Sequence, residues 1–312
     1  MLTRRAVLSL VLLAACAPGS TTAPTQPELA GSFTWLDTEG GVRVGRYTSK
    51  PWGFSTNSFV IATDAGSVIV DAQFLPSAAR ELLAVIEAEG AGPVVGAVVL
   101  HPNPDKFNGT ATLQAAGISV WTSAEVLEHI DAVFEQRTRA FAERYAPDWP
   151  DQTPRPTSLE GRTELELGEA RLVFHRLGPG CSAAHLVVEL RRGAGGGEIF
   201  VGDLASGDTH LWLELGLLDA WRERLAELRA LEPVRVHPGR GASGGVELLA
   251  RNDAYLGEVR ELVLASEPGE AGRDAILETM QGRYPELDYL VFLELGLPAV
   301  AQALPALAGS GR

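Results

Sequence analysis

Side chains that can carry chemistry stand at the ends of several apolar runs in this 312-residue chain. His101 directly follows the run at 94–100, Cys181 lies in the loop at 177–182, and Asp203 follows a third run. Imidazole, thiolate and carboxylate groups can bind a metal, and a thiol beside an imidazole can act as a nucleophile. A buried thiol or an ion-paired carboxylate can equally be structural. These residues therefore mark a candidate site whose chemistry depends on what surrounds them.

Strands and helices that alternate along the chain must position these side chains. Apolar runs bounded by turn residues predict strands at 42–47, 58–62, 67–71, 94–100, 118–121, 163–167, 170–177, 186–191, 198–201 and 233–237. Apolar residues at helical spacing predict helices at 77–89, 109–116, 126–145 and 220–231, a mostly helical chain from 246 on, and a last helix after Pro298. The long charged helix at 126–145 is expected to lie over the fold as an insertion. This order predicts a layered α/β sandwich.

Four of the loops and strand ends resemble, in order, the signature motifs of the metallo-β-lactamase superfamily. The counterparts of its His-x-His-x-Asp-His, Gly-Pro-x-His-Thr, Gly-Asp and Pro-Gly-His-Gly motifs are residues 100–109, 177–182, 200–204 and 236–241. The resemblance covers roughly residues 40–250. It implies a four-layer αββα sandwich formed by residues 32–250, with residues 251–312 as a helical C-terminal extension packed on the same domain.

The resemblance also implies a zinc site, because histidines and aspartates of these motifs hold one or two zinc ions in that family. The metal lowers the pKa of a bound water to about 7, which gives the hydroxide that attacks β-lactams, thioesters, lactones, phosphodiesters or other esters. Matching residues are retained at His101, Asp105 and Asp203. The family's histidines are replaced at four positions, namely Asn103, Lys106, Cys181 and Arg240.

The two metal positions are affected differently by these replacements. The first would have His101, Asn103 and Cys181, of which the imidazole and the thiolate are good zinc ligands and the amide is a poor one. The second keeps two aspartates but gains Lys106 and Arg240, which repel a dication and can neutralise buried carboxylates without it. We therefore expect the dinuclear zinc site to be lost and at most one zinc to be bound.

Two functions follow from this site. In the first, a single zinc held by His101, Cys181 and either Asp105 or Asp203 supports hydrolysis of an ester or amide, with His101, Asp105 and Cys181 as catalytic residues. In the second, the protein is inactive and binds a ligand or partner at the cell envelope. A further alternative has Cys181 as a metal-free nucleophile with His101 as its base.

Several other residues have alternative roles. Trp52 and Phe54 lie in an early loop and are expected either to wall a substrate pocket or to pack in the first hairpin. His210 could replace a lost ligand, although packing is the more common role. His237 is expected to face away from the site, and His185 to open a strand in a structural role.

The N-terminus predicts export. Arg4 and Arg5 precede an apolar run that is too short to span a bilayer, so residues 1–15 are predicted to be a signal peptide. The run ends in Leu-Ala-Ala-Cys, which resembles a bacterial lipobox, so Cys16 is the expected lipidation site and residues 16–31 a flexible tether. The paired arginines fit a twin-arginine signal as well as an ordinary secretory one.

The charge of the chain limits its partners. The formal net charge is −14, which disfavours nucleic acid because its phosphates would be repelled. We therefore expect a small-molecule ligand or substrate, and a membrane contact only through the N-terminal lipid.

Overall fold

The computed structural model describes residues 31–193 and 196–309, and its twelve strands form two sheets. The predicted signal peptide, the lipidation site at Cys16 and nearly all of the tether lie outside the described residues. None of the described helices is both long enough and apolar enough to cross a membrane.

The first sheet has seven strands in sequence order. They are β1 (Ser32–Glu39), β2 (Val42–Thr48), β3 (Asn57–Thr63), β4 (Gly66–Val70), β5 (Val94–Val98), β6 (Val120–Thr122) and β7 (Thr157–Ser158). The first four pair antiparallel as a meander, and β4 to β7 pair parallel. Parallel strands need crossover connections, which here contain α1 (Pro76–Ala88), α2 (Pro104–Phe107), α3 (Thr110–Ala115) and α4 (Ala124–Tyr145).

The second sheet has five strands in the order β12-β11-β10-β9-β8. Their bounds are β8 (Glu164–Leu167), β9 (Ala170–Leu177), β10 (His185–Arg192), β11 (Glu198–Ser206) and β12 (Arg235–Arg240). Only β11 and β12 pair parallel, and α5 (Leu218–Ala230) connects them. The chain ends with α6 (Glu247–Ala265), α7 (Glu270–Arg283) and α8 (Leu290–Gly309).

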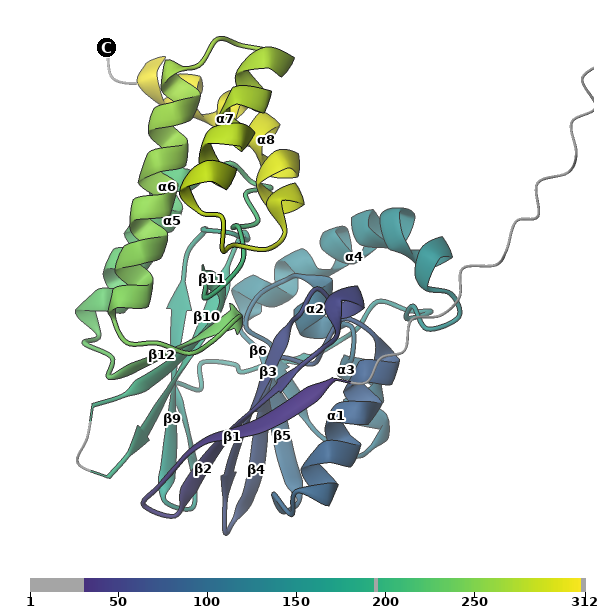
Figure 1. Cartoon of the computed structure of the whole chain (residues 1–312). Helices are drawn as coiled ribbons and strands as arrows, with labels where there is room; N and C mark the ends of the chain where they lie inside the picture. The colour runs from purple at the N-terminus through teal and green to yellow at the C-terminus, as the bar shows by residue number, and fades with distance from the viewer. Residues whose placement is uncertain (1–30, 194–195, 310–312) are drawn as a thin grey trace, which may run out of the picture.

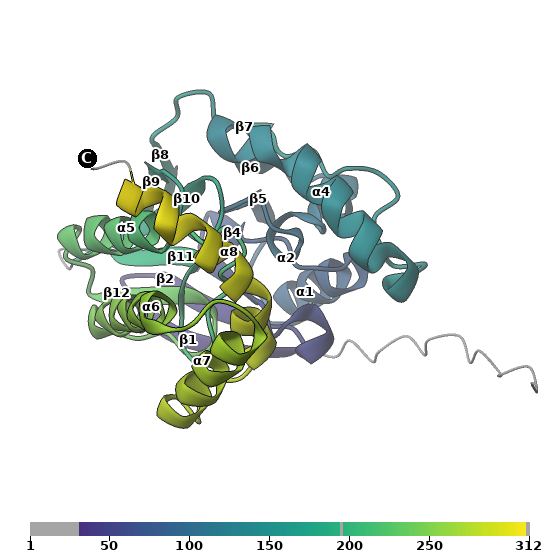
Figure 2. The same cartoon turned by 90° about the horizontal axis from the view of Figure 1, so that it is seen from above.

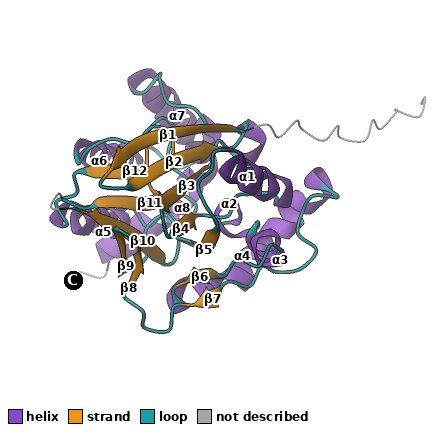
Figure 3. Ribbon diagram, turned by 90° about the horizontal axis from the view of Figure 1, so that it is seen from below, coloured by secondary structure: helices purple, strands orange, loops and turns teal. Residues whose placement is uncertain are grey.

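Three hydrophobic cores show that the molecule has four layers. Val68 and Val70 of β4 pack between the two sheets, whereas Ile69 between them packs under the helices of the first sheet. In β11, Phe200 faces the core between the sheets and Ile199 faces the core under the C-terminal helices. Successive strand residues point to opposite faces, so strands covered on both sides are apolar at every position. Figures 1 and 3 show the helices on the two outer sides of the stacked sheets.

The predicted αββα sandwich with a helical C-terminal part is confirmed. Several elements differ from the prediction: β1, the short helix α2 and the two-residue strand β7 were not predicted, and β11 extends to Ser206 rather than ending at Val201. The β1 strand lies at the sheet edge and is partly exposed. Its apolar alternation is limited to Phe33 and Trp35, which is too short a pattern to predict a strand.

The prediction that the last helix follows Pro298 was wrong. The helix α8 begins at Leu290 and contains Pro298 in its interior. Proline is expected in the first turn of a helix, where its missing N–H costs nothing, and this expectation misplaced the start. Packing decides the boundary instead, because Phe292 and Leu293, within the two turns before Pro298, are buried.

Candidate functional site

The candidate residues meet at one end of the sandwich, where strands from both sheets end. His101 follows β5, and Asp105 and Lys106 lie in the short helix α2 after it. Asp203 lies in the second half of β11, and Arg240 is the last residue of β12. The two sheets are joined at this end by a bridge between Thr56 and Arg240. The fold therefore brings together residues more than a hundred positions apart.

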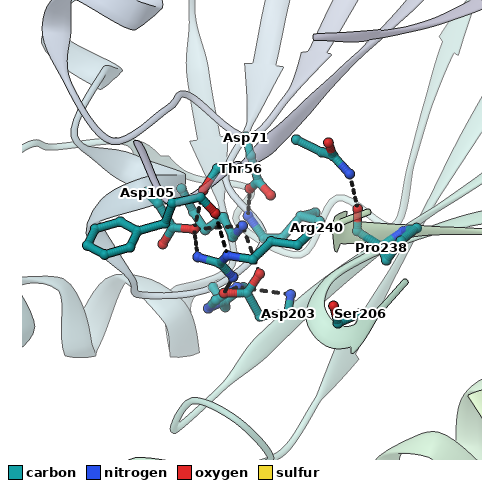
Figure 4. Close-up of polar contacts among 12 residues, drawn as sticks. Thr56, Asp71, Asp105, Asp203, Ser206, Pro238 and Arg240 are labelled. Atoms are coloured by element: carbon teal, nitrogen blue, oxygen red, sulfur yellow. Dashed lines mark hydrogen bonds and ion pairs between the residues drawn. The ribbon is translucent and has the colours of Figure 1, made fainter. Parts of the chain in front are cut away.

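Four of these side chains form a closed set of ion pairs, which we call the ionic ring: Asp105, Lys106, Asp203 and Arg240. Lys106 Nζ lies 2.9 Å from Asp105 Oδ2 and 2.9 Å from Asp203 Oδ1. Arg240 places one terminal nitrogen 2.7 Å from Asp105 Oδ2 and the other 2.6 Å from Asp203 Oδ2. Each cation thus contacts both carboxylates, so the ring is formally neutral. Figure 4 shows the Arg240 side chain between Asp105 and Asp203.

Burial and charge together fix the protonation states in the ionic ring. Burial alone raises the pKa of Asp203, but the charges of Arg240 and Lys106 outweigh it and hold the pKa well below its usual range. Asp105 is lowered in the same way by Lys106 and Arg240. Burial lowers the pKa of Lys106, yet the two carboxylates outweigh burial, so the net direction is upward. All four groups are therefore charged at neutral pH.

Neighbouring groups hold the ionic ring in place. Thr56 donates its hydroxyl to Asp105 Oδ2 at 2.9 Å, and Arg240 Nε donates to the backbone oxygen of Phe54 at 2.9 Å. Gly239 has no room for a side chain, because a Cβ there would contact the Asp203 carboxylate and lie 2.9 Å from Lys106 Nζ. Position 239 therefore requires glycine, because the Lys106–Asp203 ion pair lies directly beside the backbone there.

The second metal position of the family does not fit a zinc ion here. Its carboxylates, Asp105 and Asp203, are both engaged by Lys106 and Arg240. An ammonium and a guanidinium offer no lone pair to a metal, and a dication between them would be repelled. The two aspartates therefore belong to a salt-bridge cluster rather than to a metal site.

A second cluster lies beside the ionic ring and consists of His101, Cys181 and His185. These side chains are buried, and one potential ligand atom from each lies within 4.8 Å of the others. Cys181 Sγ lies 3.1 Å from His185 Nε2, and His185 Nδ1 lies 3.0 Å from the backbone oxygen of Gly178. Because a carbonyl only accepts, His185 carries its proton on Nδ1, and Nε2 accepts from the thiol.

His101 is also a neutral imidazole with its hydrogen bonds satisfied. The backbone N–H of Asp203 donates to His101 Nε2 at 3.3 Å, so Nδ1 carries the proton and donates to Ser182 Oγ at 3.0 Å. Burial lowers the pKa of His101 to about 4 and that of His185 to about 3. Burial, with the charge of Asp203, raises the pKa of the Cys181 thiol well above its usual value.

One more buried acid supports this region. Asp71 follows β4 and accepts the backbone N–H of Leu100 at 2.9 Å, just before His101. Burial raises its pKa to about 8, although the charge of Lys106 opposes the shift. Asp71 is therefore mostly protonated at neutral pH and connects the ends of β4 and β5.

The structure corrects two interpretations of the histidines. The imidazole partner of Cys181 is His185, not His101, and the raised pKa of the thiol argues against a thiolate nucleophile. His185 does open β10, but its ring points into the cluster. The sequence held a signal for this contact, because Cys181 and His185 are four residues apart on one loop.

Some of the remaining predicted residues line a cavity at this site, and the others lie outside it. Asn103 is half-buried and lines a cavity above the ionic ring, together with Phe54. Trp52 is 43% exposed and is not among the residues that line this cavity. His210 is also outside it and is hydrogen-bonded to the Tyr255 hydroxyl at 2.8 Å, so it packs rather than replacing a ligand. His237 faces away, toward Glu198 and Ser243.

The cavity above the ionic ring has a volume of about 260 Å³. Its floor is formed by Asn103, Asp105 and Arg240, and its walls come largely from α4 and α8. Figure 2 shows these two helices at the same end of the sandwich. His101, Cys181 and His185 are not among the lining residues, so the thiol–imidazole cluster does not face this cavity.

Comparison with known proteins defines the class to which this fold and site belong. The family model of the metallo-β-lactamase superfamily matches residues 51–240, so the chain belongs to that superfamily. A search of curated proteins by sequence gave no match.

Solved structures agree with this assignment at the level of the fold. The metallo-β-lactamase of Pontibacter korlensis superposes with a TM-score of 0.54 at 20% identity, over 72% of this chain and 99% of its own. FIM-1 from Pseudomonas aeruginosa, solved in a mono-zinc form, gives 0.54 at 19% identity, over 75% and 98%. DIM-1, exposed to ceftazidime, gives 0.53 at 20% identity, over 75% and 98%. Helix α8 lies outside the matched family region.

Proposed function

We propose that this protein is a ligand-binding member of the superfamily that does not use dinuclear zinc chemistry. The observation that carries the proposal is the ionic ring, in which Lys106 and Arg240 each contact both Asp105 and Asp203. In the family these aspartates bind metal. Here two fixed cations compensate their charge, so the buried carboxylates are stable without a dication.

The position of the remaining metal-binding side chains supports the same function. A hydrolytic centre must be open to its substrate, but His101, Cys181 and His185 are at most 5% exposed and do not line the cavity. Their ring nitrogens and thiol are already hydrogen-bonded to one another or to nearby protein groups. The cavity can hold a small molecule, whereas the buried side chains of His101, Cys181 and His185 do not face it.

From the N-terminal sequence we also propose that the protein is located at the cell envelope. The lipobox-like Leu-Ala-Ala-Cys and the preceding apolar run support export and attachment of a lipid at Cys16. The protein would then present its cavity at the cell envelope. Labelling with a radioactive fatty acid, compared between wild type and Cys16→Ser, tests this part; equal labelling contradicts it.

A single zinc ion bound by His101, Cys181 and His185 is the second candidate. This donor set has the right chemistry, since one thiolate and two imidazoles are common zinc ligands. Binding would require loss of the thiol proton and of the Cys181–His185 hydrogen bond. A zinc there would support hydrolysis only if it became accessible to a substrate.

Metal analysis separates the two candidates. We expect protein purified without added zinc to contain much less than one equivalent, and its melting temperature to be unchanged by EDTA. Near-stoichiometric zinc that is lost in Cys181→Ser and retained in His129→Gln would favour the second candidate. Zinc-dependent turnover of ester or amide substrates by the wild type would refute the proposed function.

A further inference from the structure

We infer that the cavity above the ionic ring binds an amphipathic carboxylate, an apolar molecule with one anionic end. The inference rests on the proposed function, in that it names the ligand of the same pocket. It follows from the chemistry of the cavity walls, from the lining cation Arg144, which has no acidic partner in the described part of the chain, and from apolar side chains that are exposed beside the cavity.

One wall of the cavity is a single face of α4. Arg137, Phe141 and Arg144 all line the cavity. They are spaced by four and three residues, which places them in a row along one side of a helix. Arg139, between them in sequence, is instead an exposed residue paired with Glu135. The insertion helix therefore presents two guanidinium groups with an aromatic ring between them.

Aromatic side chains form the inner part of the cavity. The Phe54 ring lies 5.0 Å from that of Phe74, 5.9 Å from Phe141 and 6.1 Å from Phe292, so the four rings form one continuous surface. Lining by several aromatic rings with a few polar groups is typical of small-molecule pockets. A volume of about 260 Å³ lies just below the usual range for drug-sized ligands, which indicates a small ligand.

The opposite wall leaves apolar side chains in solvent. Val291 and Leu295 of α8 line the cavity and are 45% and 60% exposed. Within the described residues nothing covers them. Exposed apolar groups at the rim of a pocket are typical of a binding site, and here they extend the aromatic surface outward. An apolar portion of the ligand would bury them.

The charge of the cavity favours an anion. The ionic ring is neutral, so Asp105 and Arg240 contribute no net charge. Arg137 pairs with Glu214, which is not a lining residue. Arg144 has no acidic partner within the described residues and lies over the Trp52 ring at 5.1 Å. The cavity is therefore net positive in a chain whose formal charge is −14.

Together these walls fit a carboxylate bound by Arg144, with Arg137 beside it shared with Glu214, and an apolar part among Phe54, Phe141 and Phe292. Guanidinium groups bind carboxylates through paired hydrogen bonds, and aromatic walls accept either an alkyl chain or a ring. This arrangement accounts for binding without a metal, in keeping with the proposed function.

Calorimetric titration with matched probes tests the ligand class. The probes are octanoate and 3-phenylpropanoate as alkyl and aryl carboxylates, with 1-octanol and octyltrimethylammonium as neutral and cationic counterparts. We expect at least one carboxylate to bind about tenfold more tightly than 1-octanol, as charge-assisted hydrogen bonds imply. The alkyl and aryl arms show which apolar part fits. Equal binding of acid, alcohol and ammonium, or no binding of either acid, would overturn the inference.

Variants locate the two ends of the ligand. Arg137→Gln/Arg144→Gln should weaken carboxylate binding about tenfold and remove the preference over 1-octanol, whereas Arg139→Gln on the same helix should change neither. Leu295→Ser should weaken binding, whereas Val234→Ser, which is equally exposed at 60%, should not. Unchanged binding in the double arginine variant would contradict the assigned site. Zinc-dependent hydrolysis of p-nitrophenyl octanoate would refute the proposed function but not the ligand class.

Discussion

Replacing Lys106 by methionine is the most direct test of the ionic ring. Lys106 has no exposed surface, and its ammonium lies 2.9 Å from both Asp105 and Asp203. Methionine keeps much of the side-chain length but removes the charge. Two buried carboxylates would then share the single cation Arg240, and the site would carry one uncompensated negative charge.

The size of the effect follows from the burial of the pair. Removing one partner of a buried ion pair costs about 3–5 kcal/mol, because the remaining charge stays buried without compensation. At about 2 °C per kcal/mol for a folded unit of this size, the melting temperature of Lys106→Met should fall by roughly 6–10 °C. Lys50→Met is the matched control, since Lys50 is the other lysine of the chain and is exposed.

The loss of stability caused by Lys106→Met should also depend on pH, and it should be larger at pH 8 than at pH 5. In the wild type, the pKa values of Asp105 and Asp203 lie below their unfolded values, so their stabilisation is present above about pH 4 and is lost below it. In Lys106→Met, two carboxylates share one cation, so the pKa of one of them rises above its unfolded value. Protonation then relieves the repulsion, and the deficit measured at pH 8 should shrink at pH 5.

Thermal unfolding followed by circular dichroism at both pH values measures these effects. The double variant Lys106→Met/Asp203→Asn restores charge balance, so it should regain about 0.5–3 kcal/mol relative to the sum of the single changes. The reasoning is refuted if Lys106→Met melts within about 1 °C of Lys50→Met. It is also refuted if the loss of stability is the same at pH 5 and pH 8.

Three further predictions concern the same end of the sandwich. Lys106→His/Arg240→His places imidazoles where the family has them, so it should bind zinc in equilibrium dialysis more tightly than the wild type; no gain would contradict the view that these cations exclude the metal. In a Cys16→Ser background, Cys181 should react with a thiol reagent at least about 100-fold more slowly in the native protein than in denaturant. The reason is that the thiol is buried and its pKa is raised. Similar rates in the two states would show that the thiol is accessible. Asp71→Asn should fold, because the amide replaces a protonated carboxyl whose pKa is about 8. The unfolded acid ionises near pH 4 and the folded one near pH 8, so the wild type loses stability as pH rises through this interval and the asparagine variant should gain relative to it; a difference that does not change with pH would contradict the raised pKa.

The sequence alone determined the family and the layered fold, and it predicted the loss of the second metal position. Strand patterns are local, and four motifs in a fixed order specify one topology. The replacement of histidines by Lys106 and Arg240 is visible without a structure, and charge alone implies that these residues compensate Asp105 and Asp203. Local pattern was insufficient where packing overrides propensity, as in the early start of α8 before Pro298.

Only the tertiary structure decided what surrounds His101 and Cys181, the candidate zinc-binding side chains. The pairing of Cys181 with His185, rather than with His101, depends on how the loop before β10 turns its side chains inward. The cavity depends on α4 and α8, which are more than a hundred residues apart and meet only in the folded chain. Sequence spacing gives the face of one helix, but which second helix lies across from it is set by long-range packing, and that packing determines the pocket.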